Sequence, residues 1–277
     1  MVKSAAIPLV IVLFVTNYLL HSHSHDNHHL VLALVVPSTY GIGSLIFPIR
    51  KTLVTGISDN TNNANKRIEL QEVSDFFVDA FWTGKVGGGA KTLSKLQRQQ
   101  LEQSQNAEFT KRYGNSRRIS ELLLVRSNSN NSNSNNSNNN NNIDEIMACV
   151  GVEVDKIPTS GTIRNPLTTE SAPLMSNLAV SKKYRRRGLA EQLVRSVETM
   201  VRKEWGYNEC YLYVEERNRP AIQLYSKLGY RNVWRDTTAM TLLPTTSGDL
   251  QSTSTVIVCM KKKLYNDGNI FQRLFQR

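Results

Sequence analysis

The stretch Leu178-Ala-Val-Ser-Lys-Lys-Tyr-Arg-Arg-Arg-Gly-Leu-Ala190 decides the fold of this chain. An apolar run ends at Val180, three arginines and a glycine follow, and apolar residues at helical spacing begin at Leu189. This order predicts a strand, a turn rich in backbone N–H donors, and the positive end of a helix dipole. Such a turn binds anions, and a pyrophosphate suits it.

The segments on both sides of this stretch complete a strand–helix–strand unit. Pro173 to Val180 predicts the first strand and Cys210 to Val214 the second, and a crossover of this length makes the two strands parallel. The helix between them carries two neighbouring apolar rows at i+4 spacing, so it should bury one broad face. Its solvated face is expected to carry Glu191, Arg195, Glu198 and Arg202.

A second motif, Asn218-Arg-Pro-Ala-Ile-Gln-Leu-Tyr-Ser-Lys-Leu-Gly-Tyr230, follows the second strand. Asn218 is a good helix N-cap, Pro220 in the first turn needs no N–H partner, and Gly229 ends the helix. Elsewhere the pattern predicts a strand start at 67–72, helices at 73–82 and 92–113, strands at 120–125, 146–154, 231–234 and 255–260, and loops at 157–172 and 244–254. The polar residues of the 92–113 helix are expected to face solvent.

The two motifs together resemble those of a known family. Arg185 to Ala190 fits the signature Arg/Gln-x-x-Gly-x-Gly/Ala, and Asn218 to Tyr230 fits Asn-x-x-Ala-x-x-Leu-Tyr-x-x-x-Gly-Tyr. On these residues the chain resembles the GNAT superfamily of N-acetyltransferases, most closely its plastid-type and ribosomal-protein-type members. The resemblance is sharp over 173–234 and extends over 67–264.

The resemblance implies a fold and an activity. The fold would be an α/β (α+β) GNAT fold, whose mixed, mostly antiparallel sheet has a splayed parallel strand pair at the acetyl-CoA site and is flanked by helices. The activity would be acetyl-CoA-dependent transfer of an acetyl group to a primary amine by direct attack, with no covalent enzyme intermediate. The acceptor amine, whether a protein N-terminus, a lysine or a small amine, is left open.

The resemblance also implies the residues of the acetyl-CoA site. Main-chain groups of Leu178, Ala179 and Val180 would hold the pantetheine arm and the thioester, and an N–H near Val180 would hold the oxyanion. Asn218 would touch the CoA arm, and Tyr225 would protonate the departing thiolate. The pyrophosphate would be wrapped by Arg185, Arg186, Arg187, Gly188, Leu189, Ala190 and Glu191.

The general base is not assigned by the resemblance. Some relatives use a glutamate on the strand before the second motif, but the aligned residue here is Tyr213, which has no carboxylate. Glu153, Glu170 and Glu215 are the candidates, and a water relay to solvent is another route. A catalytically weak or inactive CoA-binding module is therefore the alternative to an enzyme.

Composition limits the partners. The 277 residues are 40% apolar, enough for a globular core, and the net charge of +11 predicts an anionic partner. The cofactor phosphates account for the arginine cluster, and no nucleic-acid motif or aromatic-interleaved basic groove is present. The three cysteines lie singly in apolar runs, which indicates buried free thiols and neither a disulfide frame nor a metal site.

Residues 1–58 are expected to be a targeting presequence. Ala5 to Leu20 is typical of a signal peptide, so the chain should enter the secretory pathway. Leu30 to Ile49 is again uncharged, and because Asp26 is the only acidic residue among the first fifty, we expect it to be the transit-like half of a bipartite plastid address. The alternative is a membrane anchor, with the endoplasmic reticulum or another membrane as the location. The five histidines between His21 and His29 are read as a polar spacer and not as a metal site.

The acetyltransferase domain is expected over residues 59–265, followed by a tail at 266–277. The tract from Ser127 to Asn142 contains only Asn and Ser and buries no apolar surface, so it should be a disordered insertion. Lengthening a hairpin loop in this way costs little, because closure entropy grows with the logarithm of length. We therefore expect strands 120–125 and 146–154 to pair across it.

Overall fold

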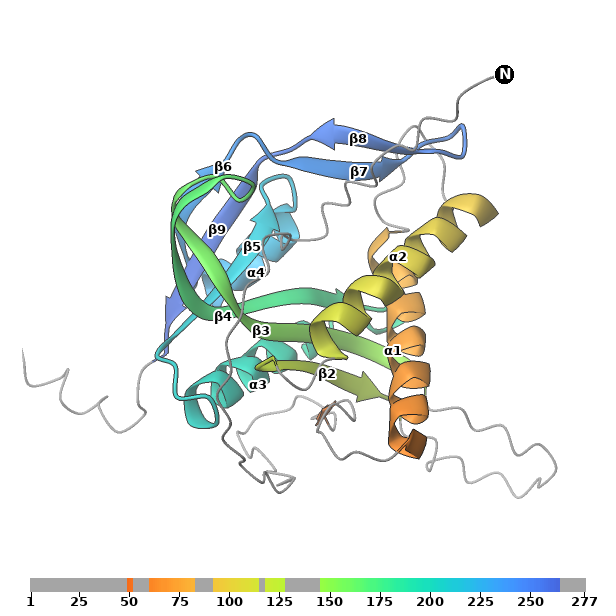
Figure 1. The fold of residues 1–277 in the computed structure, drawn as a ribbon, viewed down its shortest axis with the longest axis horizontal. Helices are drawn as coiled ribbons and strands as arrows, with labels where there is room; N and C mark the ends of the chain where they lie inside the picture. The colour runs from red at the N-terminus through yellow and green to blue at the C-terminus, as the bar shows by residue number, and fades with distance from the viewer. Residues whose placement is uncertain (1–48, 52–59, 83–91, 115–117, 128–144, 265–277) are drawn as a thin grey trace, which may run out of the picture.

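The computed structural model describes residues 49–51, 60–82, 92–114, 118–127 and 145–264 (Figure 1). The expected signal segment, the histidine cluster, nearly all of the Asn/Ser tract and the C-terminal tail lie outside these residues. Strand β1 (Ile49–Lys51) pairs antiparallel with β2 (Ser120–Arg126), so the described sheet begins upstream of residue 59, where the domain is expected to start.

In the described part of the chain, seven strands form one mixed sheet in the order β1-β2-β3-β4-β5-β9-β6. The pairing of β4 with β5 is parallel and the other pairings in this sheet are antiparallel, which confirms the predicted mixed sheet. A separate hairpin is formed by β7 and β8. The remaining bounds are β3 Ile146–Gly161, β4 Pro166–Val180, β5 Glu209–Glu215, β6 Arg231–Asp236, β7 Met240–Pro244, β8 Leu250–Ser254 and β9 Ile257–Lys263.

Helices cover both faces of the sheet. Leu123 of β2 packs in one apolar cluster with Val197 of α3 (Leu189–Lys203), and that cluster also takes in α4 (Arg219–Lys227). Leu122 packs in a second cluster with Phe77 of α1 (Asn60–Phe81) and Phe109 of α2 (Lys95–Tyr113). Neighbouring residues of a strand point to opposite faces, so α1 and α2 cover one face and α3 and α4 the other.

The elements around the first motif form as expected, with one exception. The buried face of α3 is made of the predicted apolar rows, although Ala190 is only half-buried. Glu198 was expected in solvent, but its side chain is only 11% exposed and pairs with Lys262 Nζ of β9 at 2.6 Å. A lysine of β9 therefore covers a charge that helical periodicity assigns to the solvated face of α3.

The Asn/Ser tract interrupts a hairpin, as predicted. Strands β2 and β3 pair antiparallel, from Ser120 opposite Glu153 to Arg126 opposite Ile146. The backbone N–H of Ser127 donates to the carbonyl oxygen of Glu145 at 2.9 Å, which joins the two chain ends that lead into the tract. The insertion thus leaves the pairing of its flanking strands intact.

Three predictions of secondary structure are wrong. Residues 67–72 are helical and not the start of a strand, because Leu70 lies one turn before the buried Val73 and shares its face of α1. The segment 157–172 is not a loop, since β3 and β4 continue as a paired arm. Likewise 244–254 contains β8, which pairs with β7. Backbone pairing needs no apolar side chains, so these polar strands carry no apolar signal.

All three cysteines are buried and free, as predicted. Among the described residues, no cluster of His, Cys, Asp or Glu has the arrangement of a metal site. No helix in the described ranges is long and apolar enough to cross a membrane.

Candidate functional site

The first feature of the site is a bulge near the end of β4. The register with β3 passes from Gly151 opposite Ser176 to Cys149 opposite Ala179, so two residues of β4, Asn177 and Leu178, face one residue of β3. Asn177 has a left-handed backbone with φ of 54°. A bulge of this kind bends its strand and redirects the backbone groups that follow.

The second feature is the splay between β4 and β5. In the described sheet their parallel pairing covers Leu174 opposite Tyr211 and Met175 opposite Leu212, and it stops there. The bulge begins just beyond the last pair. The main chain from residue 177 to 180 therefore does not pair with β5, and its N–H and C=O groups on that side are available to a ligand.

The third feature is the turn that leads into α3. A short 3₁₀ segment, η3 (Lys182–Tyr184), is followed by Arg186 with φ of 63° and by Gly188 with φ of 81°. Gly188 is the N-cap of α3, and a Cβ built on it would meet nothing within 4 Å. The first-turn amides of α3 thus face open space at the positive end of the helix, which is the geometry of an anion site.

The three arginines of the turn have different surroundings. Arg185 Nε donates to the carbonyl oxygen of Val180 at 3.0 Å, and its Nη2 donates to the carbonyl oxygen of Ala80 at 2.8 Å. The Arg187 guanidinium lies 5.4 Å from the centre of the Tyr184 ring. Arg186 is exposed and forms no ion pair with any described residue. Arg185 therefore joins the ends of β4 and α1, while the other two remain at the surface of the turn.

The second motif forms α4 together with its N-terminal cap. Asn218 caps α4, because its Oδ1 accepts from the Ala221 N–H at 3.3 Å, and Pro220 lies in the first turn, as predicted. Tyr225 is 8% exposed and belongs to the apolar cluster against which Leu178 packs. Burial, and next the nearby Cys210, raise the pKa of Tyr225 well above its ordinary value. The phenol is therefore protonated at neutral pH, the form that a general acid requires.

The three glutamates considered as bases are all engaged. Glu153 pairs with Arg112 Nη2 at 2.5 Å, and its side chain is 1% exposed. Glu170 accepts a short hydrogen bond from the Tyr211 hydroxyl. Glu215 accepts from Thr241 Oγ1 at 2.9 Å. Burial also raises the pKa of Tyr213, at the position where some relatives carry a glutamate, which suppresses its anionic form.

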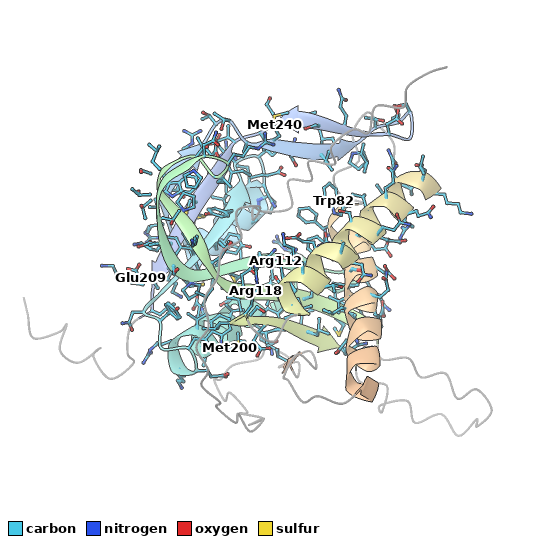
Figure 2. All side chains as sticks on the ribbon, viewed as in Figure 1. Trp82, Arg112, Arg118, Met200, Glu209 and Met240 are labelled. Atoms are coloured by element: carbon cyan, nitrogen blue, oxygen red, sulfur yellow. The ribbon has the colours of Figure 1, made fainter. Side chains whose placement is uncertain are left out.

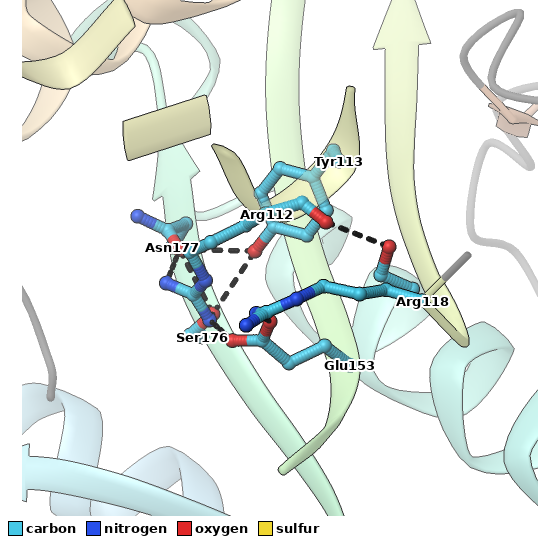
Figure 3. A network of polar contacts seen from close by, with 7 residues as sticks. Arg112, Tyr113, Arg118, Glu153, Ser176 and Asn177 are labelled. Atoms are coloured by element: carbon cyan, nitrogen blue, oxygen red, sulfur yellow. Dashed lines mark hydrogen bonds and ion pairs between the residues drawn. The ribbon is translucent and has the colours of Figure 1, made fainter. Parts of the chain in front are cut away.

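A polar cluster beneath the bulge was missed by sequence reasoning. Arg112 and Tyr113, at the end of α2, contact Ser176 and Asn177 of β4 (Figure 3). Figure 2 places Arg112 between α2 and the sheet. The expectation that α2 turns its polar residues to solvent is therefore wrong in part. Its buried stripe consists of Gln97, Leu101, Gln105, Phe109, Arg112 and Tyr113, a helical spacing that an apolar pattern search overlooks.

A hollow of about 480 Å³ lies between α1 and the start of η3. Its walls carry the carboxylates of Glu72, Asp79 and Glu145, together with Phe76 and Lys182. Each of these carboxylates already pairs with a basic side chain: Glu72 with Arg126, Asp79 with Arg98 and Glu145 with Lys183.

Comparison with known proteins agrees with these features. Residues 139–230 match the model of the Acetyltransferase (GNAT) family. GCN5-related N-acetyltransferase 4, chloroplastic, from Arabidopsis thaliana is 30% identical over 120 residues, which cover 43% of this chain and 38% of that protein. An N-alpha-acetyltransferase from Saccharolobus solfataricus is 37% identical over 57 residues, 21% of this chain and 34% of that protein. The chain thus spans little more than a third of the length of these relatives.

Among solved structures, NAA60 of Arabidopsis thaliana in complex with acetyl-CoA is similar with a TM-score of 0.48 and 14% identity, covering 78% of this chain and 97% of that one. The mixed sheet splays between β4 and β5, the bulge lies at the predicted strand, and the turn leads into an α3 whose first-turn amides are open. These are the parts of the predicted GNAT fold. Within this fold, residues 139–230 are similar in sequence to the GNAT family of acetyltransferases.

Proposed function

We propose that the chain is an acetyl-CoA-dependent N-acetyltransferase that moves an acetyl group to a primary amine by direct attack. One observation carries the proposal. The bulged end of β4 parts from β5 after Met175 and leads directly into a turn whose backbone N–H groups open at the N-terminus of α3. An extended ligand with an anionic end suits a stretch of main chain that is unpaired with β5 and leads to a helix N-terminus.

The residues present fit acetyl-CoA. The open space at Gly188 and the exposed side chains of Arg186 and Arg187 suit a pyrophosphate, with the first-turn amides of α3 as donors. Main-chain groups of 178–180 would hold the pantetheine arm and the thioester. In this arrangement Arg185 supports the turn through Val180 and Ala80, and its predicted direct contact with phosphate remains part of the proposal.

The proposed reaction replaces the C–S bond of the thioester by a C–N bond. It also needs two proton transfers, one away from the amine and one to the departing sulfur. The amine nitrogen attacks the thioester carbonyl carbon, so a C–N bond forms and the C–S bond breaks. A backbone N–H near Val180 stabilises the negative charge on the carbonyl oxygen. Tyr225, held protonated by its burial, gives its proton to the departing sulfur.

Removal of the amine proton is proposed to occur through water. Glu153, Glu170 and Glu215 all have partners, and the raised pKa of Tyr213 disfavours its anion. An amine that is already partly neutral needs only a relay to solvent. We therefore expect the rate to rise with pH as the acceptor amine loses its proton, with no requirement for a carboxylate base.

Our proposals for the acceptor class and for the location in the cell rest on the names of similar proteins. The archaeal relatives carry the name N-alpha-acetyltransferase, so peptide N-termini are the first acceptors to test, ahead of lysines and small amines. The Arabidopsis relative carries the name chloroplastic, which supports the plastid as location. Sequencing the mature N-terminus from cells tests the location, because a chain that starts before residue 30 excludes a removed presequence.

Replacing Tyr225 by Phe tests the enzymatic proposal. Acetyl transfer from labelled acetyl-CoA to a peptide library is measured beside CoA affinity by calorimetry. We expect kcat to fall about 100-fold with CoA affinity unchanged, which is typical for loss of a general acid. Tyr230→Phe is the matched control, because that ring is also buried and lies 5.9 Å from the Tyr225 ring.

Three outcomes are decisive. A fall in kcat confined to Tyr225→Phe supports the acid role, whereas equal falls in both variants make the tyrosine a packing residue. A wild-type chain that binds CoA but acetylates no peptide, lysine or polyamine is an inactive binding module. A chain that does not bind CoA contradicts the proposal altogether.

A further inference from the structure

The polar cluster beneath the β4 bulge contains charges that the proposed chemistry does not use. The side chains of Arg112 and Glu153 are each 1% exposed and form an ion pair. Arg118 reaches the same carboxylate at 3.3 Å from the edge of the cluster. Burying charges is unfavourable unless every partner is in place. We therefore asked what the buried charges next to the β4 bulge contribute besides packing.

We propose that Arg112 and Tyr113 are positioning residues that hold the bulge of β4 in place, and so aim the main-chain groups of 178–180 at the thioester. This inference rests on the proposed function, because it assigns a task to the same site. Neither side chain is proposed to touch the substrate. Both act through Ser176 and Asn177, which precede the ligand-binding main chain by one to two residues.

The contacts converge on one atom. Oδ1 of Asn177 accepts hydrogen bonds from Arg112 Nη1 at 2.9 Å, from the Tyr113 hydroxyl at 3.2 Å and from Ser176 Oγ at 2.8 Å. Arg112 Nη2 also donates to Ser176 Oγ at 2.6 Å. Asn177 is a non-glycine residue in the left-handed region. Such a conformation persists where the surrounding structure over-determines it, and here α2 supplies that restraint.

Gly151 of β3 makes room for this contact. It lies opposite Ser176 in the register, and a Cβ built on it would collide with the Tyr113 hydroxyl. The missing side chain is therefore what lets the phenol of Tyr113 reach the bulge. A strand glycine that packs against a side chain from another element marks a close approach between the two.

The far side of the cluster fixes α2 to the sheet. Ser120 Oγ of β2 donates to the carbonyl oxygen of Arg112 at 2.8 Å, and Glu153 of β3 holds its guanidinium. The Cys149 thiol donates to the carbonyl oxygen of Asn177 at 3.4 Å. The bulge is thus tied to β2 and β3 through α2. A shift of the end of α2 would move the main chain that binds the thioester.

Asn177→Gly and Tyr113→Phe test the inference. Glycine accepts the left-handed backbone but offers no Oδ1, so the strain is relieved and only the anchor is lost. Phenylalanine keeps the ring over Gly151 and removes the hydroxyl. We expect each variant to lower kcat about tenfold and to leave CoA affinity within about twofold, because an oxyanion donor is misaimed while the phosphate site stays intact.

Asn177→Asp is the conservative rescue, since it restores an acceptor oxygen to Arg112 and Tyr113. We expect it to recover most of the kcat lost in Asn177→Gly. Lys262→Met is the matched control: it breaks the Glu198–Lys262 pair, whose side chains are 11% and 20% exposed, on α3 and β9. It should lower the thermal midpoint and leave kcat unchanged.

Amide hydrogen exchange at residues 177–180 separates this inference from the proposed function. Exchange there should be faster in Tyr113→Phe and Asn177→Gly than in Lys262→Met, whether or not the wild-type chain transfers acetyl groups. If the proposed function is wrong, the wild-type chain will transfer no acetyl groups. If this inference is wrong, the variants will exchange the amides of residues 177–180 as slowly as the wild type does, or they will lose stability while keeping their kcat.

Discussion

Arg185 Nε donates to the carbonyl oxygen of Val180 at 3.0 Å, so the first arginine of the turn bonds back to the end of the strand that precedes it. The same guanidinium donates to the carbonyl oxygen of Ala80 at 2.8 Å. Family resemblance assigns this side chain to the pyrophosphate. Its contacts show that it connects the end of α1 to the turn before α3.

Arg185→Ala should therefore reduce stability where Arg186→Ala does not. Losing the two hydrogen bonds of an exposed side chain should lower the free energy of unfolding by about 1–2 kcal/mol. Arg186→Ala should stay within about 0.5 kcal/mol of the wild type and weaken CoA binding instead. Urea denaturation and calorimetry with CoA measure the two effects. Equal stability of the two variants would contradict the bracing role of Arg185.

Gly188 and Gly206 offer a matched pair of substitutions with which to test the proposed cofactor site at Gly188. Their φ angles are 81° and 75°, and a Cβ on either would meet nothing within 4 Å. Alanine at either position should cost about 1–2 kcal/mol of backbone strain. Only Gly188→Ala should weaken CoA binding, because its methyl group would enter the space beside the first-turn amides of α3. CoA affinities that fall equally in both variants would place the phosphates elsewhere.

Gln97 joins the N-terminus of α2 to the β7–β8 hairpin, which reaches across to it in Figure 1. Its Nε2 donates to the carbonyl oxygens of Thr245 at 2.8 Å and Asp249 at 2.7 Å, and its Oε1 accepts from the Ser94 N–H at 2.9 Å. Gln97→Glu keeps the capping bond and loses both donors. We expect faster hydrogen exchange in β7 and β8 and a loss of about 2 kcal/mol in unfolding free energy.

Gln97→Ala removes the capping bond as well, so it serves as the comparison for Gln97→Glu. Its extra effect should appear at the start of α2, as faster exchange of the first-turn amides. If hairpin exchange in Gln97→Glu matches the wild type, the two carbonyl contacts do not hold the hairpin on α2.

Asp155 should make stability depend on pH. Burial, and next the charge of Glu153, raise the pKa of Asp155 from 3.8 to about 6. The folded chain thus holds this proton more tightly than the unfolded chain does. The stability that the proton contributes is complete below pH 3.8 and is lost as the pH rises through about 6.

Asp155→Asn should remove the loss of unfolding free energy that accompanies ionisation of Asp155, because asparagine does not ionise. After discounting for partial exposure, we expect the variant to exceed the wild type by about 1 kcal/mol in unfolding free energy at pH 7.5. The gap should close as the pH approaches 4. Denaturant unfolding at both pH values measures it, and a gap that does not change with pH would show that the carboxyl titrates normally.

Much of the fold could be predicted because its signals are local. Asn218 caps α4, and its first-turn Pro220 and the Gly229 that follows its C-cap lie within one short segment. The apolar rows of α3 follow a period of a few residues, and so do those of the second half of α1. Such preferences act between neighbours in the chain, so a pattern search finds them.

The errors arose where a distant partner supplies the bonds. The polar residues of 157–172 and β8 are strands because a second strand pairs with their backbones. Glu198 faces inward because Lys262 of β9 covers it. The spacing of apolar and polar residues within these segments does not indicate which other element they will contact.

The sequence by itself determined the family motifs, the strand–turn–helix order around Leu178 to Ala190 and the capped helix at Asn218. The tertiary structure alone decided what holds the bulge: Arg112 of α2 bonded to Asn177 of β4. It also decided that Arg185 bridges two elements. The physical reason is separation along the sequence. Propensity, periodicity and capping act between residues a few positions apart, whereas these contacts form only once the sheet has brought remote segments together.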